Sequence, residues 1–135
     1  MPNFEREINE LHAFFVDWFT AKLPHTPEGF ARFDKVTHPN FHVINPAGVL
    51  AGGTDLKQVI YDEYDQRHDF RIWIENVAVQ HAFDNIVVAT YEEWQEIKGE
   101  TTARLSTVVF TRDDSKPNGL VWQCVHETWL PINET

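Results

Sequence analysis

The residues that could do chemistry concentrate in the last third of the chain. Arg104 and Glu127 lie in two runs, Thr101–Arg112 and Leu120–Pro131, whose β-branched and aromatic residues predict the paired strands of a hairpin. If two-residue turns join neighbouring strands, Arg104 and Glu127 share one face of the sheet with Tyr91 of the preceding strand. A single β-bulge would exchange the two faces.

This trio suits acid–base chemistry. A carboxylate in an apolar pocket tends toward a raised pKa, which fits a general acid or base, whereas an adjacent arginine lowers the pKa again. Tyr91, Arg104 and Glu127 are therefore our candidate catalytic residues. The alternative is a cross-strand ion pair between Arg104 and Glu127 that only satisfies two buried charges, which is the commoner arrangement in sheets.

Other patterns exclude several kinds of site. His38 and His42 lie four residues apart, but on a loop and a strand, and the remaining histidines come from separate elements, so no metal site is expected. Cys124 lacks an activating neighbour and is typical of a small buried hydrophobe. The sequence contains no phosphate-binding loop, dinucleotide fingerprint or Gly-x-Ser-x-Gly motif, so we predict no cofactor.

The elements that position these residues follow from hydrophobic period and turn signals. Apolar residues at helical spacing predict three helices: one capped by Asn3 and ended by Pro24, one from Thr26–Pro27 to Lys35, and one from Thr54 to about Gln66. A short strand, Asn40–Asn45, lies between the second and third helices. From Phe70 the period changes to two and predicts four long strands, namely Phe70–His81, Ile86–Ile97, Thr101–Arg112 and Leu120–Pro131. This order predicts an α+β fold with helices on one face of a curved antiparallel sheet.

Length and charge narrow the possible partners. A chain of 135 residues is expected to form one domain, 1–135. Its net charge of −10 argues against nucleic acid and anionic membranes as partners. No apolar run is long enough to span a membrane, no basic-then-apolar leader is present, and a single cysteine fits a reducing compartment, so we expect a cytoplasmic protein.

The order of elements resembles a known superfamily. Together with the segment HPNFHVINPAGVLAGGTDL and the ending ARLSTVVFTRDD…VWQCVHETWLP, it is similar to the nuclear-transport-factor-2-like superfamily, in its SnoaL-like and calmodulin-kinase association-domain branch. The resemblance covers essentially the whole chain. It implies a cone-shaped, strongly curved antiparallel sheet with the three helices of the N-terminal half packed on its concave face. It also implies an apolar pocket on that face and a homodimer formed through the sheet.

The resemblance does not carry over the superfamily's best-known chemistry. In the ketosteroid isomerases of this superfamily a catalytic aspartate precedes the Pro-x-Gly turn, and the matching residue here is Asn45, which cannot abstract a proton as a carboxylate does. Their oxyanion tyrosine and neutral aspartic acid fall near Trp18 and Val108. The pocket arginines of the kinase association domains match Tyr91, Val108 and Trp129, so those charges are absent as well.

The aromatic content suggests a ligand. The chain has ten Phe, five Trp and three Tyr, which serve a core and a dimer face but leave some for a pocket. We predict that a hydrophobic or aromatic ligand is bound by Phe15, Trp18, Phe41, Asn45, Tyr91, Val108 and Trp129.

Three functions follow as alternatives. The first is a small-molecule-binding domain with acid–base chemistry of isomerase, cyclase or dehydratase type on a hydrophobic substrate. The second is a non-catalytic association module, and the third is a carrier or sensor that binds without chemistry. Because Asn45 replaces the isomerase aspartate, the sequence leaves open whether the protein is an enzyme.

Overall fold

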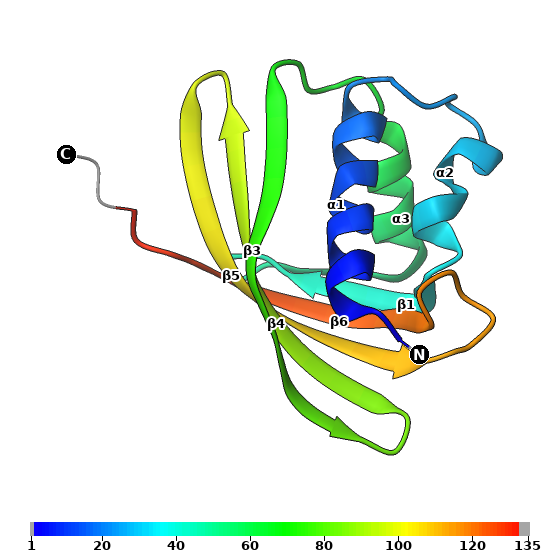
Figure 1. Cartoon of the computed structure of the whole chain (residues 1–135). Coiled ribbons are helices and arrows are strands. Elements are labelled where there is room, and N and C mark those ends of the chain that lie inside the picture. Colours follow the sequence, from blue (N-terminus) through cyan, green and yellow to red (C-terminus); the bar gives the residue numbers. More distant parts are fainter. Residues whose placement is uncertain (1, 133–135) are drawn as a thin grey trace.

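Three helices pack on one side of a strongly curved sheet. The computed structural model describes residues 2–132. In chain order the elements are α1 (Phe4–Phe19), α2 (Pro27–Asp34), β1 (Thr37–Ile44), β2 (Leu50–Gly52), α3 (Gly53–Asp62), β3 (Phe70–Phe83), β4 (Ile86–Ile97), β5 (Glu100–Arg112) and β6 (Leu120–Trp129). The sheet bends around α1, and the helices occupy its concave side (Figure 1). The predicted α+β cone is confirmed.

The helix starts are set by their caps. The Asn3 side chain accepts a hydrogen bond from the Arg6 amide at 3.0 Å, and the Thr26 hydroxyl accepts one from Gly29 at 3.1 Å, as the sequence predicted. The third helix ends at Asp62, earlier than expected. Beyond it the chain turns back, and the Arg67 amide donates to the carbonyl of Phe19 at the end of α1 (3.1 Å).

The sheet is mixed, whereas the sequence predicted an antiparallel one. The strand order is β2-β1-β6-β5-β4-β3, and every neighbouring pair is antiparallel except β1 and β6, which run parallel. No hairpin joins β1 to β6, so turn geometry does not impose an antiparallel direction on this pair. The short edge strand β2 was not predicted, because three residues are too few to show an alternating pattern.

Bulges in β3 and β6 change which side chains face the helices. The β3–β4 register shifts between Glu75 and Ala78, where Asn76 has φ 56°, and Val77 packs against the core. In β6 the register shifts so that Val109 pairs with Cys124 and Phe110 with Trp122. Strict alternation along β6 from the inward-facing Glu127 would place Trp122 on the outer face of the sheet, but the shift turns it inward, where it is buried.

A buried carboxylate ties the first helix to the last strand. Glu7 of α1 is fully buried and accepts two hydrogen bonds from the Arg32 guanidinium of α2, at 2.9 and 3.1 Å. It also accepts from Trp122 Nε1 at 2.8 Å and from Asn118 Nδ2 at 3.0 Å. Because four donors converge on one carboxylate, the charge is compensated although no water reaches it.

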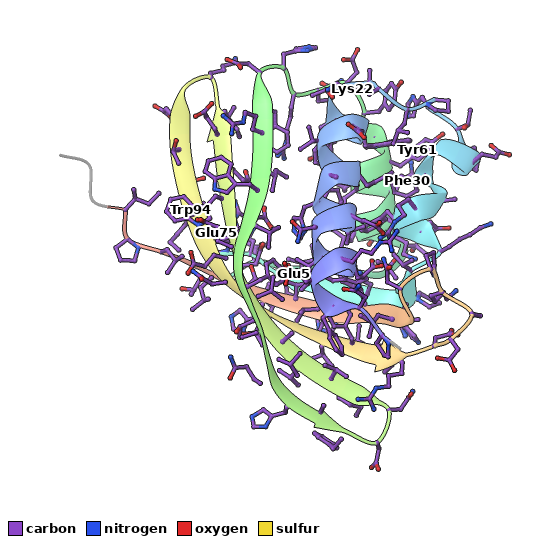
Figure 2. The ribbon with its side chains drawn as sticks, viewed as in Figure 1. Glu5, Lys22, Phe30, Tyr61, Glu75 and Trp94 are labelled. Atoms are coloured by element: carbon purple, nitrogen blue, oxygen red, sulfur yellow. The ribbon has the colours of Figure 1, made fainter. Side chains whose placement is uncertain are left out.

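Aromatic rings fill the space among the helices and cover part of the outer face. Phe30 and Tyr61 meet edge to face between α2 and α3, with their ring centroids 5.2 Å apart (Figure 2). Trp94, on the opposite side of the sheet (Figure 2), stacks on Trp73 with the ring centroids 6.0 Å apart.

None of the helices in the described part of the chain has the length and apolarity that crossing a membrane requires.

Candidate functional site

A cavity lies between the helices and the concave face of the sheet. Its volume is about 270 Å³, near the lower end of the range for ligand pockets. We call it the wide cavity; its walls come from α1, β1, β2, α3, β3, β4 and β6, and its lining residues are Phe15, Phe19, Val43, Asn45, Val49, Ala51, Leu56, Val59, Ile60, Glu63, Arg67, Ile72, Glu93, Gln95 and Glu127. Apolar side chains therefore form most of the wall.

A smaller space adjoins the wide cavity at its polar end. This narrow extension has a volume of about 70 Å³. It shares Phe15, Val43, Ile60, Glu93 and Glu127 with the wide cavity. Leu11, His12, Phe41, Tyr91, Trp122 and Val125 complete its lining. The two carboxylates therefore lie where the two spaces meet.

One arginine lies between these carboxylates. Arg104 Nη1 donates to Glu127 Oε1 at 3.2 Å, and Arg104 Nε lies 4.0 Å from Glu93 Oε2. Strand register produces this arrangement, because Arg104 of β5 pairs with Glu93 of β4, and Glu127 of β6 pairs with the neighbouring Ser106. The predicted proximity of Arg104 and Glu127 is thus present in the structure.

Sequence reasoning missed His12. This residue of α1 is buried, its Nε2 lies 2.9 Å from Glu93 Oε1, and its Nδ1 lies 2.7 Å from the carbonyl oxygen of Ile8. The Gln95 amide also donates to Glu93. A histidine four residues after Ile8, beside the apolar stripe of a helix, was the available signal, but the stripe cannot name a partner on a distant strand.

The surroundings of the two carboxyl groups push their pKa values apart. Burial raises the pKa of Glu127 to about 7; the Glu93 charge adds to this rise and Arg104 opposes it. Burial alone would also raise the pKa of Glu93, but the charges of His12 and Arg104 and the hydrogen bonds to His12 and Gln95 outweigh it and lower the pKa. Glu93 is therefore held ionised while Glu127 titrates near neutrality.

The same charges shift the pKa values of the neighbouring His12 and Tyr91. Burial alone would lower the pKa of His12, but the Glu93 charge and hydrogen bond raise it. Burial raises the pKa of Tyr91 well above its usual range, and the charges of Glu93 and Glu127 add to the rise, so the phenol stays neutral. Among the described residues, the buried Ser106 hydroxyl has no hydrogen-bond partner.

The structure distributes the predicted ligand-binding residues unevenly. Phe15 and Asn45 line the wide cavity, and Phe41 and Tyr91 line the narrow extension together with Phe15. The Asn45 side chain is already engaged, because its Oδ1 accepts from the amides of Ala47 and Val49 at 3.0 Å each.

The other three predicted residues line neither space. Trp18 is fully buried and donates to the Ile60 carbonyl at 3.0 Å, and Val108 is fully buried in the core. Trp129 is 51% exposed, and its ring lies 4.9 Å from the Arg104 guanidinium carbon. Ligand contact by any of the predicted residues stays a prediction.

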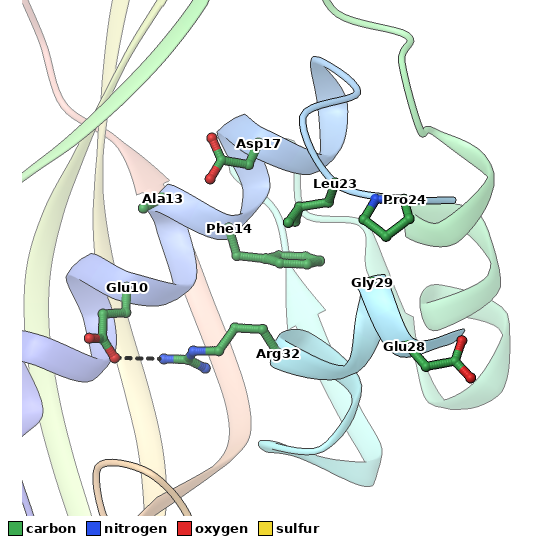
Figure 3. A pocket seen from close by; sticks show the side chains of 9 residues that line it. All are labelled: Glu10, Ala13, Phe14, Asp17, Leu23, Pro24, Glu28, Gly29 and Arg32. Carbon is green, nitrogen blue, oxygen red and sulfur yellow. Dashed lines mark hydrogen bonds and ion pairs between the residues drawn. The ribbon is translucent and has the colours of Figure 1, made fainter. Parts of the chain in front are cut away.

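A second hollow lies outside this site. An open groove of about 620 Å³ between α1 and α2 is floored by Phe14, Leu23 and Pro24 (Figure 3). Its cation, Arg32, is bound to Glu7 and Glu10, so the positive charge of the groove is already compensated, and Asp17 and Glu28 add carboxylates to its lining. Within residues 2–132, no three His, Cys, Asp or Glu side chains are grouped to hold a metal ion.

Solved structures of similar shape define the class of protein. An NTF2-like protein of unknown function from Pseudomonas aeruginosa has a TM-score of 0.83 at 25% identity, covering 95% of this chain and 98% of the other. A putative calcium/calmodulin-dependent protein kinase type II association domain from Thiobacillus denitrificans has a TM-score of 0.64 at 19% identity, with 97% and 98% covered. A putative ketosteroid isomerase from Parabacteroides distasonis has a TM-score of 0.57 at 15% identity, with 89% and 85% covered. The fold is that of the nuclear-transport-factor-2-like superfamily, as the sequence predicted.

Sequence comparison identifies the family. The family described as sucrose-6-phosphate phosphohydrolase C-terminal matches residues 4–131, and the chain belongs to it. Sucrose-phosphatase 1 of Nicotiana tabacum is 22% identical in an alignment of 135 positions, which covers 96% of this chain and 32% of the relative. Probable sucrose-phosphatase 2 of Arabidopsis thaliana is 22% identical, over 91% of this chain and 29% of the relative. The chain thus spans about a third of the length of these relatives.

Proposed function

We propose that this chain is a small-molecule-binding domain whose cavity transfers protons to and from a largely apolar ligand. The observation that carries the proposal is Glu127, a buried carboxyl group with a pKa of about 7 that lines a mostly apolar cavity. A group that is divided between its two protonation states at neutral pH can both donate and accept a proton.

Each neighbour of Glu127 has a part in this scheme. Arg104 orients the Glu127 carboxyl group through its hydrogen bond, and Glu93 remains a fixed negative charge on the other side of the guanidinium. Tyr91 supplies a neutral hydroxyl beside the narrow extension. Two carboxyl groups with separated pKa values are the pattern on which acid and base roles are assigned in known enzymes. Proton transfer of isomerase or dehydratase type fits this set.

The carboxylate cluster around Arg104 disfavours phosphate-ester hydrolysis. The name of the relatives refers to sucrose phosphatases, but the chain matches only about a third of each of them. The arginine of the cluster is already shared between two carboxylates, and adding a phosphate dianion beside them would be electrostatically unfavourable. We therefore assign the chain binding and proton transfer, not phosphatase activity.

The binding part of the proposal is tested with 4-methylphenol as a probe. Binding is measured by NMR chemical-shift titration. Ala51 lines the mouth of the wide cavity and is exposed, so Ala51→Trp should fill the mouth and weaken binding about tenfold or more. Ala82→Trp, also at an exposed strand position but outside the lining, is the matched control and should bind as the natural chain does. Equal affinities in both variants, or no binding to the natural chain, would overturn the proposal.

The acid–base part is tested separately by ¹³C NMR titration of the glutamate carboxyl groups. A signal assigned to Glu127 by the Glu127→Gln variant should titrate near pH 7. Titration near the ordinary glutamate value of about 4.3 would remove the acid–base role and leave a carrier.

A second candidate function is association. The outer face of the sheet carries apolar side chains, among them Leu105, which is 39% exposed, and a protein kinase association domain shares the fold. We propose a homodimer through this face, which is compatible with a ligand on the concave side.

A further inference from the structure

Arg67 is a fixed cation at the wall of the wide cavity, outside the ion-pair cluster of Glu93 and Glu127. Arg67 follows α3, and its guanidinium carbon lies 4.5 Å from the Phe19 ring centroid and 5.0 Å from that of Phe70. Its backbone amide donates to the Phe19 carbonyl at 3.1 Å. The two rings hold the guanidinium in place, and the hydrogen bond fixes the backbone at Arg67.

The charge of Arg67 is only partly compensated. Its one ion pair among the described residues is to Glu63, at 3.6 Å, with both side chains more than a third exposed, at 35% and 39%. A contact of that length and exposure is weak, so most of the donor capacity of the guanidinium is available. Glu63 lines the same cavity, and a dianion would meet more repulsion there than a monoanion.

Arg67 and Glu127 line different parts of one cavity. Glu127 lies where the wide cavity meets the narrow extension, whereas Arg67 lines the wide cavity and is absent from the extension. Within residues 2–132, no ion pair joins Arg67 to Glu93 or Glu127. Leu56, Ile60 and Ile72 supply apolar wall to the same space. The cavity therefore combines a cation, Arg67, with an apolar wall and with a titrating carboxyl group, Glu127.

We propose that the ligand is a small carboxylic acid with an apolar body and a hydrogen-bonding group at the far end. Its carboxylate is held by Arg67, whose planar fork matches a carboxylate with two parallel hydrogen bonds. Its apolar part fills the wide cavity, and its far polar group contacts Glu127. This inference rests on the proposed function and names its ligand class.

The test compares two probes with the same hydroxyphenyl body, 4-methylphenol and 4-hydroxyphenylacetate, by isothermal titration calorimetry. The acid should bind about five- to tenfold more tightly, and added salt should reduce this advantage. The net charge of −10 opposes any anion in general, so an advantage for the acid requires a specific cation.

Two variants identify that cation. Arg67→Met keeps an apolar stem over the two rings but removes the charge, and should bring the affinity ratio of the two probes to about one. Arg71→Met removes an exposed cation outside the cavity and should preserve the ratio. Thermal melting of both variants checks that they fold.

The outcomes separate this inference from the proposed function. If 4-methylphenol binds and the acid binds no better, the carboxylate assignment is wrong but the binding cavity stands. An advantage that persists in Arg67→Met also overturns the assignment. If neither probe binds the natural chain, the proposed function and this inference fall together.

Discussion

His12 Nε2 and Glu93 Oε1 lie 2.9 Å apart although 81 positions separate the two residues in the chain. The other ring nitrogen, Nδ1, faces the Ile8 carbonyl at 2.7 Å, and a carbonyl cannot donate. Nδ1 must therefore carry a proton, and the contact at Nε2 needs a second one. The buried pair is thus imidazolium and carboxylate, because the pKa of His12 is raised and that of Glu93 is lowered.

We expect the pair to stabilise the fold as a unit. Removing His12 alone, as in His12→Gln, leaves a buried carboxylate with Arg104 and Gln95 as its remaining partners and should cost about 3–5 kcal/mol of unfolding free energy. Glu93→Gln in the same chain should return part of this loss. The check is a double-mutant cycle by guanidinium unfolding, and additive effects of the two substitutions would show that the residues are not coupled.

Glu127 should destabilise the fold as the pH rises. Its pKa is about 7 in the folded chain against 4.5 for the unfolded reference, so the folded state binds more protons between these values and stability falls across that window. The full effect above pH 7 is at most about 3 kcal/mol. Glu127→Gln should therefore be more stable than the natural chain at about pH 8 and nearly equal to it at about pH 4.5.

Chemical denaturation at the two pH values measures this difference. The same pH dependence in Glu127→Gln and in the natural chain would mean that another group is responsible.

Glu7 should be among the costliest polar side chains to remove. Glu7→Ala leaves Arg32 and Trp122 Nε1 without their buried acceptor and should lower the unfolding free energy by about 3–5 kcal/mol. Glu5→Ala, on the exposed side of the same helix, should stay within about 0.5 kcal/mol of the natural chain. Urea unfolding compares them, and similar losses in both would contradict the role of Glu7.

A dimer through the outer face should depend on Leu105. Leu105→Glu places a charge in the centre of that face, opposite Glu92 and Thr128, and should dissociate the dimer. Leu50→Glu adds the same charge at the exposed β2 strand and serves as the control. Sedimentation velocity reports the mass, and a monomeric natural chain would contradict the prediction.

The hydrophobic pattern predicted most of the fold because strand period and turn signals are local. Arg104 was placed with Tyr91 and Glu127 correctly, since the turn at Lys98 and Gly99 holds two residues of positive φ (52° and 83°) and keeps the alternation in phase. The phase is lost where a bulge intervenes, so strict alternation along β6 would place Trp122 on the wrong face. The parallel pairing of β1 with β6 has no signature in either strand.

The site was harder to predict because its members come from distant elements. His12 and Glu93 meet only after α1 is laid across the sheet, and no spacing between them signals the contact. The position of Trp18 on the apolar stripe of α1 is equally suited to a pocket and to helix packing, so the sequence cannot separate the two. In the fold it is enclosed by Phe14, Phe30 and Tyr64.

The four hydrogen bonds at Glu7 also bear on the order in which the molecule can be built during synthesis. The helix α1 leaves the ribosome before Asn118 and Trp122, two of the partners of its buried carboxylate, which lie 111 and 115 positions further along the chain. Strand β1 likewise cannot pair with β6 until β6 has been made. Until β6 has been made, the Glu7 carboxylate of α1 would lack two of its donors and the aromatic stripe would be uncovered, so the nascent domain should stay open to chaperones and proteases until then.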